Sequence, residues 1–186
     1  AGGRVARGGS AEFRRGGDCV WEEARELYGG GRRGSADCRG AAEKEEVVFT
    51  AGATASLNTV AYAWGERFVQ AGDNLVISEM EHHSNLVPWQ LLAERKGAEI
   101  RMLPFDDEGC LRTELLPTLP DGRTRVVAVT PASNTLGTRP DLRAVIDAAR
   151  AAGAIPAVEG CQGAVPGRVD VRTLDCAFYD FAGPTH

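Results

Sequence analysis

Lysine is almost missing from this sequence. Of its 21 basic residues only Lys44 and Lys96 are lysines, and all the others are arginines. Chemistry that needs a lysine amine therefore has two candidates in 186 residues. Long apolar runs are missing as well. No segment approaches the roughly 20 apolar residues of a membrane-spanning helix, and no apolar signal core stands near residue 1. We therefore expect no membrane association and no secretion.

Paired cysteine motifs and an excess of positive charge are also lacking. The five cysteines are odd in number and include no Cys-x-x-Cys pair, which disfavours a disulfide framework or a zinc site and predicts a reduced, cytoplasmic chain. The net charge of −5 and the pI near 5.3 argue against nucleic-acid binding. The glycine-containing segment Gly52-Ala-Thr-Ala-Ser56 is neither a Walker loop nor a Gly-x-Gly-x-x-Gly fingerprint.

Strand and helix patterns alternate along most of the chain. Apolar residues make up 43% and charged residues 25%, which is ordinary for a globular protein. Apolar strand patterns that do not alternate with polar residues are separated by helical patterns, so we predict an α/β fold with a mostly parallel sheet covered by helices on both faces. The predicted strands are 47–50, 74–78, 99–103, 126–130, 155–159 and 177–181. The predicted helices are 57–68, 85–96, 111–119 and 141–152.

The first 46 residues differ from the rest. They are rich in Gly and Arg and lack apolar periodicity, apart from a possible short helix at 19–28. Such a composition predicts a weakly structured N-terminal arm over residues 1–46. Residues 47–186 are expected to form the folded domain.

A pair of histidines follows the strand predicted at 74–78. Ligands of open α/β sheets bind outside the carboxyl ends of the strands, so His82 and His83 stand at the expected mouth of a site. An imidazole there can stack on a flat ring, move a proton or bind a metal. The alternative is that one histidine faces solvent and the other caps the following helix.

Two other strand ends carry polar groups of complementary kinds. Gly52-Ala-Thr-Ala-Ser56 opens a helix, and its small residues and free N–H groups suit an anion, with Thr54 adding a hydroxyl. The alternative is that Thr54 only caps the helix. Glu159 ends a buried strand, where a carboxylate without a partner cation is costly.

Two amides complete the predicted rim. Asn134 lies in the loop after the strand at 126–130, although it could simply stabilise its own turn. Gln162 follows Glu159 in the Glu-Gly-Cys-Gln segment. An anion cradle, a ring that stacks, amides and a carboxylate together suit a phosphorylated aromatic cation such as pyridoxal phosphate.

Residues 47–181 resemble the class V aminotransferase superfamily of fold type I pyridoxal-phosphate enzymes. Within it they look most like the Suf-type (group II) cysteine desulfurases, which include selenocysteine lyases. The segments that carry the resemblance are Phe49-Thr-Ala-Gly-Ala-Thr-Ala-Ser56, Ser78-Glu-Met-Glu-His-His-Ser-Asn-Leu-Val-Pro-Trp-Gln90, Val129-Thr-Pro-Ala-Ser-Asn-Thr-Leu-Gly-Thr138, Glu159-Gly-Cys-Gln162 and Leu174-Asp-Cys-Ala-Phe-Tyr179. The resemblance implies the large domain of such an enzyme, without its C-terminal small domain.

The resemblance also implies roles for single residues. Thr54 would hold the cofactor phosphate, and His82 would stack on the pyridine ring and take part in proton movement. Asn134 and Gln162 would contact the ring substituents. Glu159 stands where the family has an aspartate that pairs with the ring nitrogen.

The family reaction converts L-cysteine to L-alanine and passes the sulfur to a cysteine of the enzyme. In the family this sulfur serves iron–sulfur cluster assembly. The resemblance therefore implies a sulfur-acceptor protein as a partner, and it also implies a homodimer.

The sequence departs from the family at the residue that binds the cofactor covalently. The family motif there is Ser-Gly-His-Lys, whereas this chain has Ala182-Gly-Pro-Thr185, so that Thr185 stands at or near the position of the lysine. The sulfur-accepting cysteine of the small domain has no counterpart. We therefore expect a truncated, inactive chain without covalently attached cofactor.

Three alternatives remain open. The first is another class V aminotransferase or lyase activity. The second is a non-enzymatic pseudoenzyme or interaction module, for example a dimerisation partner of an intact copy. The third, which has the least support, is a zinc or redox protein that uses Cys161, Cys176 and His82.

Overall fold

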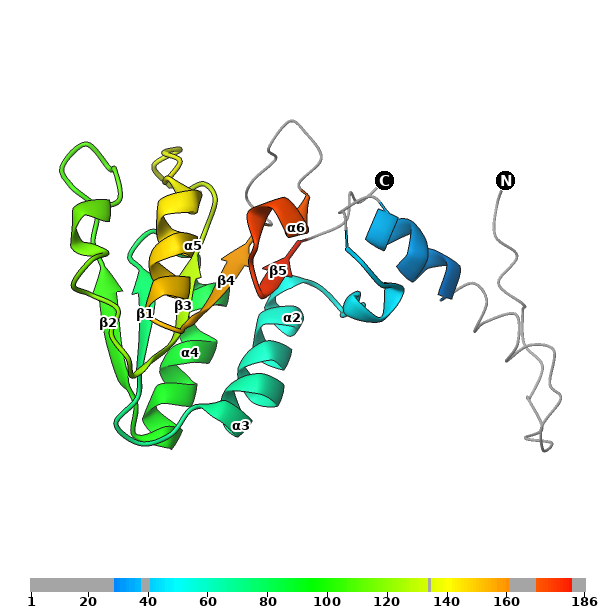
Figure 1. The fold of residues 1–186 in the computed structure, drawn as a ribbon, viewed down its shortest axis with the longest axis horizontal. Coiled ribbons are helices and arrows are strands. Elements are labelled where there is room, and N and C mark those ends of the chain that lie inside the picture. Colours follow the sequence, from blue (N-terminus) through cyan, green and yellow to red (C-terminus); the bar gives the residue numbers. More distant parts are fainter. Residues whose placement is uncertain (1–28, 38–40, 134, 161–169, 182–186) are drawn as a thin grey trace, which may run out of the picture.

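The computed structural model describes residues 29–37, 41–133, 135–160 and 170–181, and its centre is a parallel sheet (Figure 1). The strands are β1 (Asn74–Ser78), β2 (Glu99–Leu103), β3 (Thr124–Val129), β4 (Ile155–Glu159) and β5 (Phe178–Asp180). Their order is β2-β1-β3-β4-β5, and every neighbouring pair is parallel. The predicted α/β class with a parallel sheet is confirmed.

The order of the strands creates a switch point between β1 and β3. From β1 the chain moves outward to β2 and then returns to place β3 on the other side of β1. Connections on the two sides of such a point diverge, which leaves a crevice outside the carboxyl ends of the strands. The residues that follow β1 and β3 are therefore those placed best to meet a ligand.

Helices cover both faces of the sheet, as predicted (Figure 1). One face carries α4 (His83–Lys96) and a helical stretch made of α2 (Ala53–Val60), the π-helix η2 (Ala61–Gly65) and α3 (Glu66–Phe68). The other face carries α5 (Leu142–Ala151) and α6 (Val171–Leu174). The 3-10 helices η1 (Lys44–Glu46) and η3 (Thr113–Leu115) lie in connections.

Successive residues of the central strands feed two separate cores. Leu75 and Ile77 pack with Trp89 and Leu92 of α4, whereas Val76 points to the opposite face and packs with the α5 side. All five residues of β1 are buried. A strand covered on both sides needs apolar residues in consecutive positions, which explains why the sequence of β1 does not alternate.

The ends of the helices follow from local sequence. Gly97 ends α4 in the left-handed conformation, with φ of 67°, where a residue with a side chain would be strained. Asp141 caps α5 by accepting a hydrogen bond from the backbone N–H of Ala144 over 3.1 Å. Because α4 begins at His83, Pro88 lies in its second turn.

Two expectations from the sequence are wrong. Residues 47–50 form no strand; Val48 and Phe49 are 67% and 45% exposed, and no described strand pairs with this segment. The helix expected at 111–119 is reduced to the single 3-10 turn η3. Within the predicted N-terminal arm, the described residues 29–37 are helical and bury Ala36. The possible helix at 19–28 lies outside the described residues.

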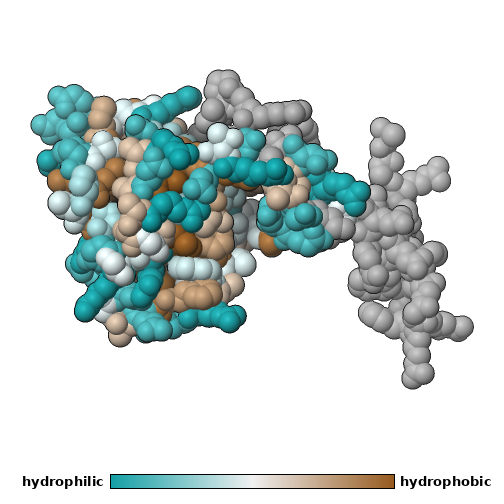
Figure 2. Space-filling view, in the orientation of Figure 1, coloured by the Kyte–Doolittle hydropathy of each residue, from teal (hydrophilic) through white to brown (hydrophobic). Residues whose placement is uncertain are grey.

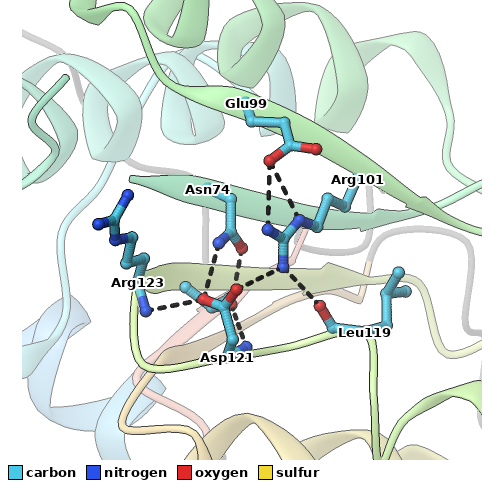
Figure 3. A network of polar contacts seen from close by, with 7 residues as sticks. Asn74, Glu99, Arg101, Leu119, Asp121 and Arg123 are labelled. Atoms are coloured by element: carbon cyan, nitrogen blue, oxygen red, sulfur yellow. Dashed lines mark hydrogen bonds and ion pairs between the residues drawn. The ribbon is translucent and has the colours of Figure 1, made fainter. Parts of the chain in front are cut away.

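Polar side chains join the amino ends of three strands (Figure 3). Asn74 of β1 donates through Nδ2 to Asp121 Oδ1 over 2.9 Å and accepts from Thr124 Oγ1 over 2.7 Å. Arg101 of β2 binds the other oxygen of Asp121 over 2.7 Å and also contacts Glu99. This network of charge-assisted hydrogen bonds fixes the amino edge of the sheet, opposite the expected site.

The surface shown in Figure 2 carries hydrophilic residues along the outer side of α5. These include Arg143 and Asp147, which form an exposed ion pair of 3.1 Å. Among the described residues, no helix is both long enough and apolar enough to cross a membrane.

The network at the amino edge makes stability depend on pH. Arg101, the backbone N–H of Arg123 and Asn74 lower the pKa of Asp121 from 3.8 to about 2. A carboxylate with a lowered pKa stabilises the fold above its unfolded pKa, and this contribution is lost as the pH falls from 3.8 through about 2. We expect Asp121→Asn to remove this part of the acid dependence, as measured by urea unfolding between pH 2 and 5.

The matched control is Asp147→Asn, which removes an exposed carboxylate from an i,i+4 pair with Arg143. Exposed pairs of this kind contribute about 0.3–0.5 kcal/mol, so the acid dependence should stay as in the wild type. Equal behaviour of the two variants would contradict the role given to Asp121.

Candidate functional site

Three of the predicted site residues lie in the described part of the chain, and all three stand at the carboxyl edge of the sheet. His82 follows β1, Glu159 is the last residue of β4, and Thr54 lies in the first turn of α2. Asn134, Gln162 and Thr185 lie outside the described residues. The expectation that these residues line one cavity therefore stays a prediction.

His82 is held by its own helix. It is the N-cap of α4, and its Nδ1 accepts a hydrogen bond from the backbone N–H of Ser84 over 3.2 Å and lies 2.8 Å from Ser84 Oγ. The ring is exposed, and the exposed ring of His83 lies 6.1 Å away between centroids. The capping alternative is thus correct for His82. A capped ring with an exposed face still suits stacking on a flat ligand.

The first turn of α2 presents backbone rather than a side-chain cap. Its N-cap is Gly52, in a conformation with φ of 139° that favours glycine, and no side chain caps the helix. The alternative that Thr54 caps this helix is therefore wrong. Thr54 is exposed on the first turn, where N–H groups of the helix end lack partners within the helix.

Glu159 is a buried carboxylate, and one of its oxygens accepts no hydrogen bond from the described residues. It is 2% exposed, and its Oε2 has no hydrogen-bond partner among the described residues. Burial, together with the charges of Glu81 and Asp180, raises the pKa of Glu159 to about 7. Asp180 is its direct partner in the register of β4 and β5. A cationic donor aimed at Oε2 would satisfy this carboxylate.

Glu81 is a site residue that the sequence reading missed. Its carboxylate accepts hydrogen bonds from Ser78 Oγ, from Asn85 Nδ2 over 2.6 Å and from the backbone N–H of Thr130 over 2.7 Å. Burial raises the pKa of Glu81 to about 7, against the lowering effect of these bonds. The signal available in the sequence was its place immediately before His82.

A cavity of about 760 Å³ lies beside β5. Its lining includes Gly52 and Ser56 at the start of α2 and Asp180 at the end of β5, together with the segment 46–51. The cavity thus connects the first turn of α2 with the carboxyl edge of the sheet. Thr54 lies between the lining residues Gly52 and Ser56 in sequence, but neither Thr54 nor His82 nor Glu159 belongs to the lining.

The nucleophiles in the described residues lie apart from this edge or are unreactive. Lys96, at the far end of α4, donates to the carbonyl of Glu66 over 2.7 Å. Burial raises the pKa of the Cys176 thiol to about 11, and Cys110 is an exposed free thiol. The described residues contain no group of three His, Cys, Asp or Glu side chains arranged to hold a metal.

Glu159 makes the stability of the fold depend on pH near neutrality. Because its folded pKa of about 7 lies above the ordinary 4.5, its contribution is complete below 4.5 and is lost as the pH rises through about 7. We expect the unfolding free energy of Glu159→Gln to fall less than that of the wild type between pH 4.5 and 8, by roughly 1–3 kcal/mol. Urea unfolding across this pH range measures both free energies. An unchanged pH dependence would contradict the raised pKa of Glu159.

Gly160 permits close contact between the ends of β4 and β5. Its N–H donates to the carbonyl of Asp180 over 2.6 Å, and a Cβ at this position would lie 2.5 Å from Tyr179 Cζ. We expect Gly160→Ala to destabilise the fold by about 1–3 kcal/mol, since the ring must move. Gly122→Ala, where a Cβ meets nothing within 4 Å, is the control and should change thermal unfolding little.

Several known proteins are similar to this chain in sequence. A cysteine desulfurase of Pectobacterium atrosepticum is 50% identical over 143 residues, which are 77% of this chain and 35% of that protein. One of Salmonella newport is 46% identical over 177 residues, which are 95% of this chain and 44% of that protein. This chain therefore spans less than half the length of these relatives.

A solved structure agrees with the fold. The Escherichia coli cysteine desulfurase CsdA superposes with a TM-score of 0.80 at 35% identity, over 94% of this chain and 45% of that chain. The model of the aminotransferase class-V family matches residues 7–184. The chain therefore belongs to the aminotransferase class-V family.

Proposed function

We propose that this chain forms part of the pyridoxal-phosphate-binding large domain of a Suf-type cysteine desulfurase. The observation that carries the proposal is the buried Glu159 carboxylate, whose Oε2 has no hydrogen-bond partner among the described residues. A protonated pyridine nitrogen is the kind of cationic donor that such an oxygen needs. The identity to cysteine desulfurases of 46–50% supports the choice of family member.

The other described residues fit the remaining parts of the cofactor. The first turn of α2 offers backbone N–H groups and the Thr54 hydroxyl to a phosphate, aided by the positive end of the helix dipole. The exposed ring of His82, fixed through Nδ1, offers a face for stacking. We assign Asn134 and Gln162 to the ring substituents on their place after β3 and β4. Bound pyridoxal phosphate would supply an electron sink for bonds at the α-carbon of an amino acid.

The residues of the chain would bind, orient and protect the cofactor and its substrate. Glu159 would keep a proton on the ring nitrogen, and His82 would hold or move a proton through its exposed Nε2 side. The carboxylates of Glu81 and Asp180 would add negative charge around Glu159 and so favour a cation there. L-cysteine is the substrate that we propose.

We propose further that this 186-residue chain holds the cofactor without a covalent bond and releases no sulfur alone. Lys96 is engaged with Glu66 at the opposite edge of the sheet, and Lys44 lies in η1, before α2. The Cys176 thiol, with its raised pKa, is a poor nucleophile at neutral pH. Lys96 is thus remote from the carboxyl edge, and the Cys176 thiol is not activated.

Partners and location follow from the same proposal. A homodimer, a sulfur-acceptor protein and a role in iron–sulfur cluster assembly would accompany the full activity. The free thiols of Cys110 and Cys176 fit a reducing compartment, so we propose the cytoplasm. A different class V activity would keep the same cofactor contacts and change the amino-acid substrate.

The proposal predicts binding of pyridoxal phosphate without covalent attachment. Equilibrium dialysis should detect binding by the wild type, and Glu159→Gln should weaken it about tenfold or more, because a neutral amide replaces the partner of the cation. Borohydride, which makes any attachment to a lysine permanent, should leave Lys44 and Lys96 unlabelled in mass spectra. The protein should form no alanine from cysteine.

The control is Glu108→Gln, which removes the same charge at an exposed residue far from β4. It should bind pyridoxal phosphate like the wild type. Equal loss in both variants, or no binding by the wild type, would refute the assigned site. Labelling of a lysine together with alanine production would refute the inactive state.

A further inference from the structure

We propose that Glu81 is a positioning residue that holds His82 in its orientation toward the cofactor site, an inference that rests on the proposed function. Glu81 lies at the switch point between β1 and β3, where the diverging connections leave a crevice outside the carboxyl ends of the strands. Its carboxylate joins the end of β1, the end of β3 and the first turn of α4. His82 is the next residue along the chain.

Three hydrogen bonds from three elements meet on this carboxylate. Ser78 Oγ, at the end of β1, and the backbone N–H of Thr130, after β3, both donate to Oε1, the latter over 2.7 Å. Asn85 of α4 donates to Oε2 through Nδ2 over 2.6 Å. Displacement of any one element would break a bond of the group, so the carboxylate fixes their relative position.

The direction of these bonds is set deep in the core. Trp89 is fully buried and donates through Nε1 to Asn85 Oδ1 over 3.0 Å. An indole can only donate, so the Asn85 amide must turn its oxygen toward Trp89 and its NH₂ toward Glu81. Position 81 therefore has to supply an acceptor, and a carboxylate supplies acceptors on both oxygens.

His82 depends on this arrangement because its ring is exposed and has no core packing to orient it. Its carbonyl accepts from the backbone N–H of Asn85 over 2.8 Å, and its Nδ1 accepts from the N–H of Ser84. Both donors belong to the turn that Glu81 holds through Asn85. The orientation of the ring thus follows from the position of that turn.

Glu81 also acts on Glu159 through charge. After burial, the charge of Glu81 is the largest influence raising the pKa of Glu159, ahead of Asp180. The titratable groups that the packed elements bring to this edge are Glu81 after β1, His82 at α4, Glu159 of β4 and Asp180 of β5. Glu81 therefore acts on two residues of the proposed cofactor site, His82 and Glu159.

The experiment compares two charge-removing variants. In Glu81→Gln the new amide would direct an N–H at Asn85 Nδ2, which is also a donor. We expect pyridoxal phosphate to bind about tenfold to a hundredfold more weakly in equilibrium dialysis. Glu79→Gln removes the same charge from an exposed residue of the same loop and should bind like the wild type.

A second readout needs no cofactor. In the wild type, Nδ1 of His82 accepts a hydrogen bond, so the neutral ring should carry its proton on Nε2, which ¹⁵N NMR detects. Glu81→Gln should mix the two tautomers and shift the Ser84 amide signal. Ser78→Ala, which removes one of the donors to Glu81, should shift the Ser84 amide signal less. This variant keeps the test available if Glu81→Gln fails to fold.

A double variant tests the direction of the bonds. In Glu81→Gln with Asn85→Asp, the new amide at 81 can donate to the new carboxylate at 85, which can still accept from Trp89. We expect the His82 tautomer to return to that of the wild type. The affinity for pyridoxal phosphate should return to within about threefold of the wild type, less than the factor of ten that 1.4 kcal/mol represents. A double variant that behaves like Glu81→Gln alone would overturn the positioning role.

The two proposals fail in different ways. If the wild type binds no pyridoxal phosphate but Glu81→Gln mixes the tautomers, the proposed function falls and the positioning of His82 by Glu81 stands. If the wild type binds the cofactor and Glu81→Gln changes neither affinity nor tautomer, the positioning role is wrong. Loss of affinity without change in the His82 signals would also overturn it.

Discussion

Parallel pairing of five short strands, of which the three central ones are covered from both sides, is the constraint on which this structure depends. It requires consecutive apolar residues in β1, β3 and β4, and it places the carboxyl end of every strand at the same edge. In these three central strands, polar residues stand only near the ends. The amino edge uses them for a salt-bridged network, whereas the carboxyl edge gathers carboxylates and the N-terminus of α4. Structure and site are thus separated along the strand direction.

The carboxyl edge gathers carboxylates, and Oε2 of the buried Glu159 has no hydrogen-bond partner among the described residues. Glu81, Glu159 and Asp180 lie close enough for the charges of two of them to raise the pKa of the third. A protein that buries carboxylates in this way loses stability unless they bind protons or a cationic partner. A ligand with a protonated ring nitrogen would remove that penalty, which is why we regard the arrangement as a binding site and not as a structural feature.

Much of this fold could be predicted because its signals are local. The bounds of β2 and β4 were predicted correctly, and β4 places Glu159 at the edge as expected. Residues 47–50 were wrongly predicted to form a strand, because an apolar run indicates a preference for burial but not which strand would pair with the segment. Glu81 was missed because its role depends on donors from Ser78, Asn85 and Thr130, which meet only through the order of the strands. The alternative that Thr54 caps α2 fails because the N-cap is Gly52, which contributes only backbone.

Arg101 has a consequence beyond the amino edge that it stabilises. It belongs to β2, the outer strand of the described sheet, and it lies between the carboxylates of Glu99 and Asp121. An outer strand offers unpaired N–H and C=O groups to strands of other molecules, which promotes aggregation. Fixed charges of both signs along β2 make such pairing unfavourable, because an incoming strand would have to displace or desolvate them. The ion pairs of Arg101 with Glu99 and Asp121 thus also oppose the pairing of a further strand with β2.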